Sequence, residues 1–200
     1  MAFTRAAHAR NLVGPIIRST YRITCVNAEA VPHQGAVVIV CDWNNIAAPA
    51  VLKAALPRPV HVWADGPAGV PGPLMSVTGD LAMPVTRLGL DVVSRATRML
   101  EDGEAVAAIG VADLGYALAR SGAPVLPVHI HAPTTKRPTD PPTRKADISV
   151  IVGDLQPCPE YVNVAPATRA SVREAGEWAR QVLVDSASST ARETERPHDQ

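Results

Sequence analysis

The segment Ala36–Cys41 limits the fold of this chain more than any other. It is continuously apolar and rich in β-branched residues, a pattern typical of a strand that is buried on both faces of a sheet. A polar turn, Asp42–Asn45, follows it, and Pro49–Ala55 then has the pattern of a helix. Open α/β sheets bind ligands beside such strand–turn–helix junctions. The turn is therefore a candidate site, although it offers no histidine, serine or cysteine at its apex.

Further strand-like and helix-like patterns follow along the chain and favour alternating strands and helices. The pattern predicts further strands at 21–27, 60–64, 81–85, 105–109, 124–130 and 147–152. It predicts further helices at 91–101, 114–120 and 168–183, the last of them amphipathic. This alternation indicates a single α/β domain whose mixed, mostly parallel sheet is flanked by helices.

The chain divides into three parts. Residues 1–22 place apolar side chains near helical spacing with arginines between them, which predicts either an ordinary packing helix or an interfacial helix that rests on anionic lipid. Residues 23–184 form the α/β domain, and a total of 200 residues is enough for one buried core. Residues 185–200 are polar, so we predict a disordered tail.

Composition and charge argue against several classes of protein. The 19 basic and 19 acidic residues cancel, and aromatic residues make up 4% of the chain, so no nucleic-acid partner is indicated. Cys25, Cys41 and Cys158 lack the spacing of a zinc site or a disulfide framework. We therefore expect no metal and no cofactor. The absence of a secretory signal and of a long apolar run predicts a cytoplasmic protein.

Four segments occur in an order that points to a known family. The first is Val31-Pro-x-x-Gly-Ala-Val-Val-Ile-Val-Cys41, and the second is Leu81-Ala-Met-Pro-Val-Thr-Arg87. The third runs from Glu104 into the helix at 114–120, and the fourth is Gly122-Ala-Pro-Val-Leu-Pro-Val128. Together they resemble the lysophospholipid and glycerolphosphate acyltransferases, which include the bacterial 1-acylglycerol-3-phosphate acyltransferases. The resemblance extends from about Asn11 to Val182 and implies a glycerolphosphate-acyltransferase-like fold.

The family's catalytic residues are missing at the matching positions. In the family the first segment leads into Asn-His-x4-Asp, where the histidine deprotonates the acceptor hydroxyl and the aspartate orients it. This chain has Asp42 for the asparagine, Trp43 for the histidine and Ala48 for the aspartate. An indole at position 43 would fill the acceptor cleft and obstruct a hydroxyl group.

The family's phosphate site is retained only in part. Arg87 matches the arginine that contacts the acceptor phosphate, so the resemblance implies phosphate binding there; a solvated arginine at a strand end is the alternative. The family's Glu-Gly-Thr-Arg segment is absent, and residues 110–113 join strand to helix directly. One wall of the phosphate site is therefore predicted to be missing.

Three other residues are candidate substitutes in proton transfer. Asp42 stands in the turn, and His129 and His131 alternate on a strand near its carboxyl end, the edge at which α/β sheets bind ligands. A carboxylate is a weak base for an alcohol, so the histidines are the better candidates.

Two functions remain open on this reasoning. The first is a degenerate acyltransferase-like protein that has lost the transfer chemistry and binds a lipid or a protein partner. The second is an active acyltransferase in which Asp42, His129 or His131 acts with Arg87. The resemblance implies an acyl thioester and a lysophospholipid as ligands, and a peripheral contact with the inner face of the membrane.

Overall fold

The computed structural model describes most of the chain. The described residues are 11, 13–64, 81–82, 90–110, 114–137, 140–162 and 167–194. The strands are β1 (Arg22–Val26), β2 (Val37–Cys41), β3 (His61–Ala64), β4 (Leu81–Ala82), β5 (Ala105–Ile109), β6 (Val125–His131) and β7 (Asp147–Val152). The helices are the short 3-10 helix η1 (Ala28–Ala30), α2 (Ala48–Ala55), α4 (Leu90–Glu101), α5 (Leu114–Ser121) and α6 (Arg169–Thr194). Residues 13–20 are helical as well.

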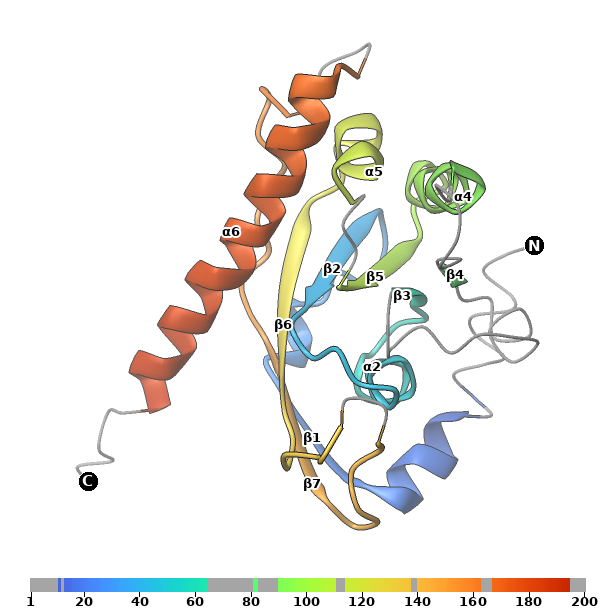
Figure 1. Cartoon of the computed structure of the whole chain (residues 1–200), viewed down its shortest axis with the longest axis vertical. Coiled ribbons are helices and arrows are strands. Elements are labelled where there is room, and N and C mark those ends of the chain that lie inside the picture. Colours follow the sequence, from blue (N-terminus) through green and yellow to red (C-terminus); the bar gives the residue numbers. More distant parts are fainter. Residues whose placement is uncertain are drawn as a thin grey trace.

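The strands form one 7-stranded sheet in the order β1-β7-β6-β2-β5-β3-β4. Strands β2 to β6 run in one direction, whereas β7 pairs antiparallel with β6 and β1 pairs parallel with β7. The predicted mixed, mostly parallel sheet flanked by helices is confirmed (Figure 1). The carboxyl ends of β2, β5 and β6 meet at one edge, which we call the carboxyl edge, and the turn after β2 lies there.

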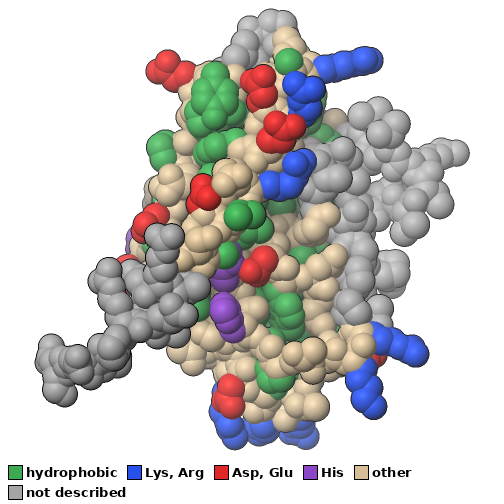
Figure 2. Space-filling model, turned by 60° about the vertical axis from the view of Figure 1, so that its left-hand side comes forward, with side chains coloured by type: hydrophobic (Ala, Val, Ile, Leu, Met, Phe, Trp, Pro, Cys, Tyr) green, Lys and Arg blue, Asp and Glu red, His purple; other side chains and the backbone are tan. Residues whose placement is uncertain are grey.

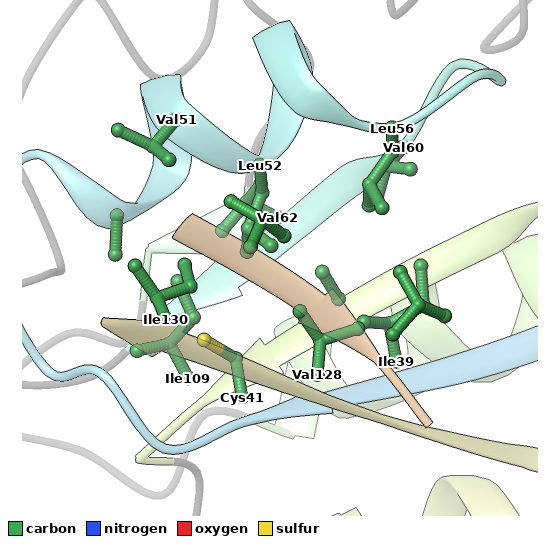
Figure 3. Packing of buried hydrophobic residues seen from close by; sticks show 14 of the residues in the cluster. Ile39, Cys41, Val51, Leu52, Leu56, Val60, Val62, Ile109, Val128 and Ile130 are labelled. Carbon is green, nitrogen blue, oxygen red and sulfur yellow. The ribbon is translucent and has the colours of Figure 1, made fainter. Parts of the chain in front are cut away.

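Helix α2 covers one face of the sheet, which we call the α2 face. Val51, Leu52 and Leu56 point from α2 and the residue after it toward the sheet, above side chains such as Val62 and Ile130 (Figure 3). All of these side chains are buried. Burying an aliphatic side chain of this size stabilises the fold by about 1.5–3 kcal/mol, so the continuous apolar pattern of β2 is explained by burial on both sides.

Helices α4, α5 and α6 cover the opposite face, which we call the α6 face. Figure 1 shows α6 as a long red helix along one side of the sheet with α5 beside it. The two helices approach closely at Gly115 and Gly176, because a Cβ atom on Gly115 would collide with the backbone carbonyl of Val172. Small residues at this crossing therefore set the distance between α5 and α6.

The N-terminal helical residues 13–20 pack beside α2. The guanidinium of Arg18 donates two hydrogen bonds to the carbonyl oxygen of Ala54, at 3.1 and 2.7 Å. Ile17 packs against the core, while Ile16 is 64% exposed. The helix thus has one packed side and one open side. No helix in the described residues is both long and apolar enough to cross a bilayer.

Helix α6 differs from its predicted extent. It continues to Thr194, so the predicted boundary at residue 184 is wrong and residues 185–194 are helical rather than a disordered tail. A helix gains one hydrogen bond for each residue added to an existing turn, so a polar segment can extend a helix that packing has already nucleated. Residues 195–200 lie outside the described part, as do residues 83–85 of the strand predicted at 81–85.

A buried arginine ties together the amino ends of the central strands. Arg58 donates hydrogen bonds to the carbonyl oxygens of Pro32 and Gly35, both at 2.9 Å, and to that of Gly103 at 3.3 Å. Burial lowers the pKa of Arg58, and the negative charge of Glu104 opposes that change. This edge of the sheet is therefore held by a hydrogen-bonded cation, far from the turn after β2.

Candidate functional site

The turn after β2 directs successive side chains to opposite faces of the sheet. Val38 and Val40 belong to the core of the α6 face, whereas Ile39 and Cys41 belong to that of the α2 face. The alternation continues into the turn, since side chains of an extended chain point alternately to the two faces. Asp42 lies on the α6 face and Trp43 on the α2 face. Neighbouring residues of one turn thus serve two different surfaces.

Trp43 and Ala48, which the sequence resemblance aligns with the family's catalytic residues, lie on the α2 face. Trp43 is half-buried and packs against the hydrophobic core there. Ala48 is fully buried at the start of α2. Neither side chain can accept a proton, because an indole N–H only donates and a methyl group does neither.

Asn45 fixes the shape of the turn. Its side-chain oxygen accepts a hydrogen bond from the backbone N–H of Ala47 at 2.9 Å, and its amide donates to the carbonyl oxygen of Asp140 at 3.1 Å. An asparagine that bonds its own backbone two residues on is a common turn device. Asn45 is 3% exposed, so it acts as a structural residue that ties the turn to the segment after β6.

Asp42 forms a hydrogen-bonded pair with His129 on the α6 face. The carboxylate oxygen Oδ2 lies 2.7 Å from Nδ1 of His129, and Oδ1 accepts a hydrogen bond from the backbone N–H of Ile130 at 3.3 Å. A histidine with its hydrogen on Nδ1 donates to this carboxylate. Of the three candidate substitutes, the structure therefore brings Asp42 and His129 together.

The two histidines of β6 differ in their surroundings. His129 is 2% exposed, and its Nε2 atom has no hydrogen-bond partner among the described residues. His131 ends the strand, is exposed, and lines a separate shallow pocket with Thr24 and Asp147. His131 thus takes no part in the pair with Asp42, and the shared strand face predicted for the two histidines does not give them a shared site.

Cys41, which precedes the pair, is unsuited to nucleophilic chemistry. Burial raises the pKa of its thiol to about 12, with Asp42 adding to the rise and a backbone hydrogen bond from Trp43 opposing it. Because the thiolate is the reactive form of cysteine, this thiol stays inert at neutral pH. Cys41 therefore acts as a small buried apolar residue.

A cavity of about 460 Å³ opens beside Asp42 on the α6 face. Its polar lining comes from Asp42, Asn44 and Arg180, and its apolar lining includes Leu114 and Leu183. Gly110 borders the cavity with a φ of 64°, and a Cβ atom there would lie 3.2 Å from the amide nitrogen of Asn44. The left-handed backbone therefore favours glycine at this position, and a larger residue would also press on the Asn44 side chain.

Sequence reasoning missed part of this cavity. Arg180 stands on the polar side of a helix, and nothing in its local sequence distinguishes it from the other charged residues of that helix. Asn44 was visible in the turn, but its position beside Gly110 depends on the pairing of β2 with β5. Arg87, the predicted phosphate ligand, lies outside the described residues, as do residues 111–113. No group of three metal-ligating side chains occurs in the part that the structure describes.

A second buried histidine lies at the opposite edge of the sheet. Nε2 of His61 approaches Oε2 of Glu104 to 2.6 Å, although the alignment is not that of a good hydrogen bond to that oxygen. Both side chains are almost fully buried, next to Arg58. The three side chains form a buried polar cluster at the amino edge, and we interpret His61 as a structural histidine of the sheet.

The comparisons with known proteins support the fold. The structure is similar to that of the 1-acyl-sn-glycerophosphate acyltransferase PlsC from Thermotoga maritima, with a TM-score of 0.55 and 11% sequence identity over 90% of this chain and 78% of that chain. No protein-family model matches the sequence, and no curated protein matches it significantly. The predicted acyltransferase-like fold is therefore confirmed at the level of architecture.

Proposed function

We propose that this chain is a degenerate lysophospholipid acyltransferase-like protein that lacks the family's transfer chemistry and retains a lipid- or partner-binding role. The packing of Trp43 and Ala48 carries this proposal. By the resemblance they occupy the positions of the family's base and its orienting carboxylate; Ala48 is fully buried in the core of the α2 face, and Trp43 is half-buried against that core. Acyl transfer to a hydroxyl group needs a proton acceptor beside that hydroxyl, and neither residue supplies one.

Two surface features support binding to an anionic lipid surface. The helical residues 13–20 expose Ile16, and the backbone N–H of Lys145 donates to the carbonyl of Thr20, which brings Arg22 and Lys145 beside that helix. Figure 2 shows Lys and Arg side chains gathered at the lower end of the molecule. An exposed apolar side chain next to basic residues suits the boundary between lipid headgroups and acyl chains. An acyl thioester or a lysophospholipid is the ligand class that the fold suggests.

A transfer assay with an acyl-CoA donor and lysophosphatidic acid tests the loss of chemistry. We expect no turnover above that of a blank reaction. Turnover that survives in Asp42→Asn, His129→Gln and His131→Gln variants would overturn the proposal and would place the chemistry elsewhere.

A second candidate function is favoured by the pair of Asp42 and His129. A histidine that donates to a carboxylate is the arrangement of a general base, so an active acyltransferase with rearranged residues would use this pair. Its substrate would have to enter from the α6 face, since Asp42 lies there. Turnover abolished by Asp42→Asn and by His129→Gln, and unchanged by His131→Gln, would establish this second function.

Sedimentation with phosphatidylglycerol vesicles tests the lipid contact. We expect the protein to sediment with the vesicles and the Ile16→Asp variant to bind several-fold more weakly. Val184→Asp is the matched control, because Val184 is 58% exposed on α6, which Figure 1 shows on the other side of the sheet from residues 13–20. Equal binding of the two variants would contradict the proposed orientation, and no binding of the unmodified protein would leave a protein partner as the remaining role.

A further inference from the structure

We propose that the cavity beside Asp42 binds a small zwitterion, a molecule that carries an ammonium group and an anionic group on a short apolar body. This site lies on the α6 face, so it does not depend on the proposed loss of chemistry on the α2 face. Four features support it: the position of the cavity in the sheet, a fixed carboxylate, a guanidinium that has no carboxylate partner among the described residues, and an apolar lining around the two.

The cavity lies where the sheet topology favours ligand binding. After β2 the chain crosses to α2 on the α2 face, and after β5 it continues to α5 on the α6 face. Because β2 and β5 are neighbours, their connections leave in opposite directions and open a crevice at the carboxyl edge. Open α/β sheets bind ligands at such a switch point. Asp42 and Gly110, the residues that directly follow these two strands, both line the cavity.

Asp42 is positioned to receive the ammonium group. His129 and the backbone N–H of Ile130 hold its two oxygens, and 42% of the side chain remains exposed. Each carboxylate oxygen has two lone pairs, so each retains an acceptor site after these contacts. His129 cannot rotate away, since it is 2% exposed under α6. The carboxylate is thus fixed in place before a ligand arrives, which reduces the entropy that binding would lose.

Arg180 is positioned to receive the anionic group. It lines the same cavity from α6, and no carboxylate of the described residues lies within 4.0 Å of its guanidinium. A guanidinium binds carboxylate and phosphate oxygens through two parallel hydrogen bonds. Leu114, the first residue of α5, also lines the cavity, and the first turn of a helix favours negative charge.

The two charges face one cavity without forming an ion pair with each other. The rest of the lining is largely apolar, with Leu114, Ala179 and Leu183. A ligand with a single charge would pair with only one of the two charged residues. A zwitterion with a short apolar body satisfies both charges and covers the apolar lining. The larger cavity, of about 740 Å³ beside Asp154 and Asp185, lacks a basic side chain among its lining residues and offers no such pair.

Two sources could supply this chemistry, and calorimetric titration of the full chain separates them. L-leucine represents a free apolar amino acid, and O-phosphoethanolamine represents a lipid headgroup. The single-charge analogues are 3-methylbutylamine and 4-methylpentanoate for leucine, and ethylamine and ethyl phosphate for phosphoethanolamine. We expect one zwitterion to bind at least tenfold more tightly than both of its analogues, and the zwitterion that does so identifies the source.

Variants then test the two charged residues of the cavity. Asp42→Asn and Arg180→Gln should each weaken the preferred zwitterion at least tenfold. Arg173→Gln, on the same helix but paired with Glu177 at the surface, should leave it unchanged. Arg180 is exposed, so its replacement keeps the test valid if the Asp42 variant fails to fold. The proposal is overturned if neither zwitterion exceeds its analogues by threefold, or if Arg180→Gln binds as the unmodified protein does.

Discussion

The turn after β2 contributes packing side chains to one face of the sheet and a hydrogen-bonded carboxylate to the other. On the α2 face, Ala48 lies in the core, Trp43 packs against it, and neither side chain is a proton acceptor. On the α6 face, Asp42 pairs with His129 beside an open cavity. Asp42 and Trp43 are neighbours in sequence, yet they belong to the two different arrangements. A carboxylate at position 42 therefore cannot replace a base at position 43, because the backbone directs the two side chains to different faces.

The cavity on the α6 face depends on the close approach of α5 and α6. A substitution at this crossing should have the largest effect on the free energy of unfolding. In a Gly115→Ala variant the new methyl group would meet the carbonyl of Val172, which belongs to the backbone and cannot move aside. We expect the free energy of unfolding to fall by about 3 kcal/mol, measured by urea denaturation.

Gly14 supplies the control for this substitution on the other face. It lies in the helical residues 13–20, and apart from its own helix no heavy atom of the described residues is within 4 Å of a Cβ placed there. Gly14→Ala should change the free energy of unfolding by less than about 0.5 kcal/mol, because the gain in helix propensity is opposed by the preference of a residue before Pro15 for extended backbone. Equal effects of the two variants would mean that the crossing of α5 and α6 is not tight.

The pair of Asp42 and His129 should contribute less to the free energy of unfolding than the crossing of α5 and α6 does. In an Asp42→Ala variant the Nδ1–H of the buried His129 loses its acceptor, and an unsatisfied buried donor costs about 1–3 kcal/mol. We expect a loss of about 2 kcal/mol in thermal or urea unfolding.

Asp147→Ala is the matched comparison for Asp42→Ala. Asp147 pairs with Arg22 at 3.3 Å, but both side chains are more than half exposed, and exposed pairs contribute about 0–1 kcal/mol. If Asp42→Ala lowers the free energy of unfolding no more than Asp147→Ala does, the buried pair adds nothing to stability.

The smallest effect concerns Cys41 and appears only at high pH. Its pKa is about 12 in the folded protein, against 9.0 for an ordinary thiol. Between these values the unfolded chain loses the thiol proton and the folded chain keeps it, so stability falls as pH rises above about 9. From pH 8 to pH 10 the unmodified protein should lose about 1 kcal/mol more stability than Cys41→Ala. Parallel pH profiles of the two proteins would contradict this.

Sequence reasoning predicted the frame more completely than the site. The strands at 105–109 and 147–152 match their predicted bounds, because the first is a continuous apolar run, the second alternates between buried and more exposed positions, and turn residues flank both. The pairing of Asp42 with His129 could not be predicted, since 87 residues separate them and the contact depends on β2 lying beside β6. The separation of His129 from His131 depends on where β6 leaves the core, which local sequence does not specify.

The hydrogen bonds of Arg58 determine where the chain can be cut. One guanidinium joins the carbonyls of Pro32, Gly35 and Gly103, so two loops far apart in sequence are held as one unit at the amino edge. New chain ends introduced at 32–35 or at 103 would release that unit. New ends in the loop at 132–137, at the other edge, leave it intact. A circularly permuted form of this protein should therefore begin and end at the carboxyl edge.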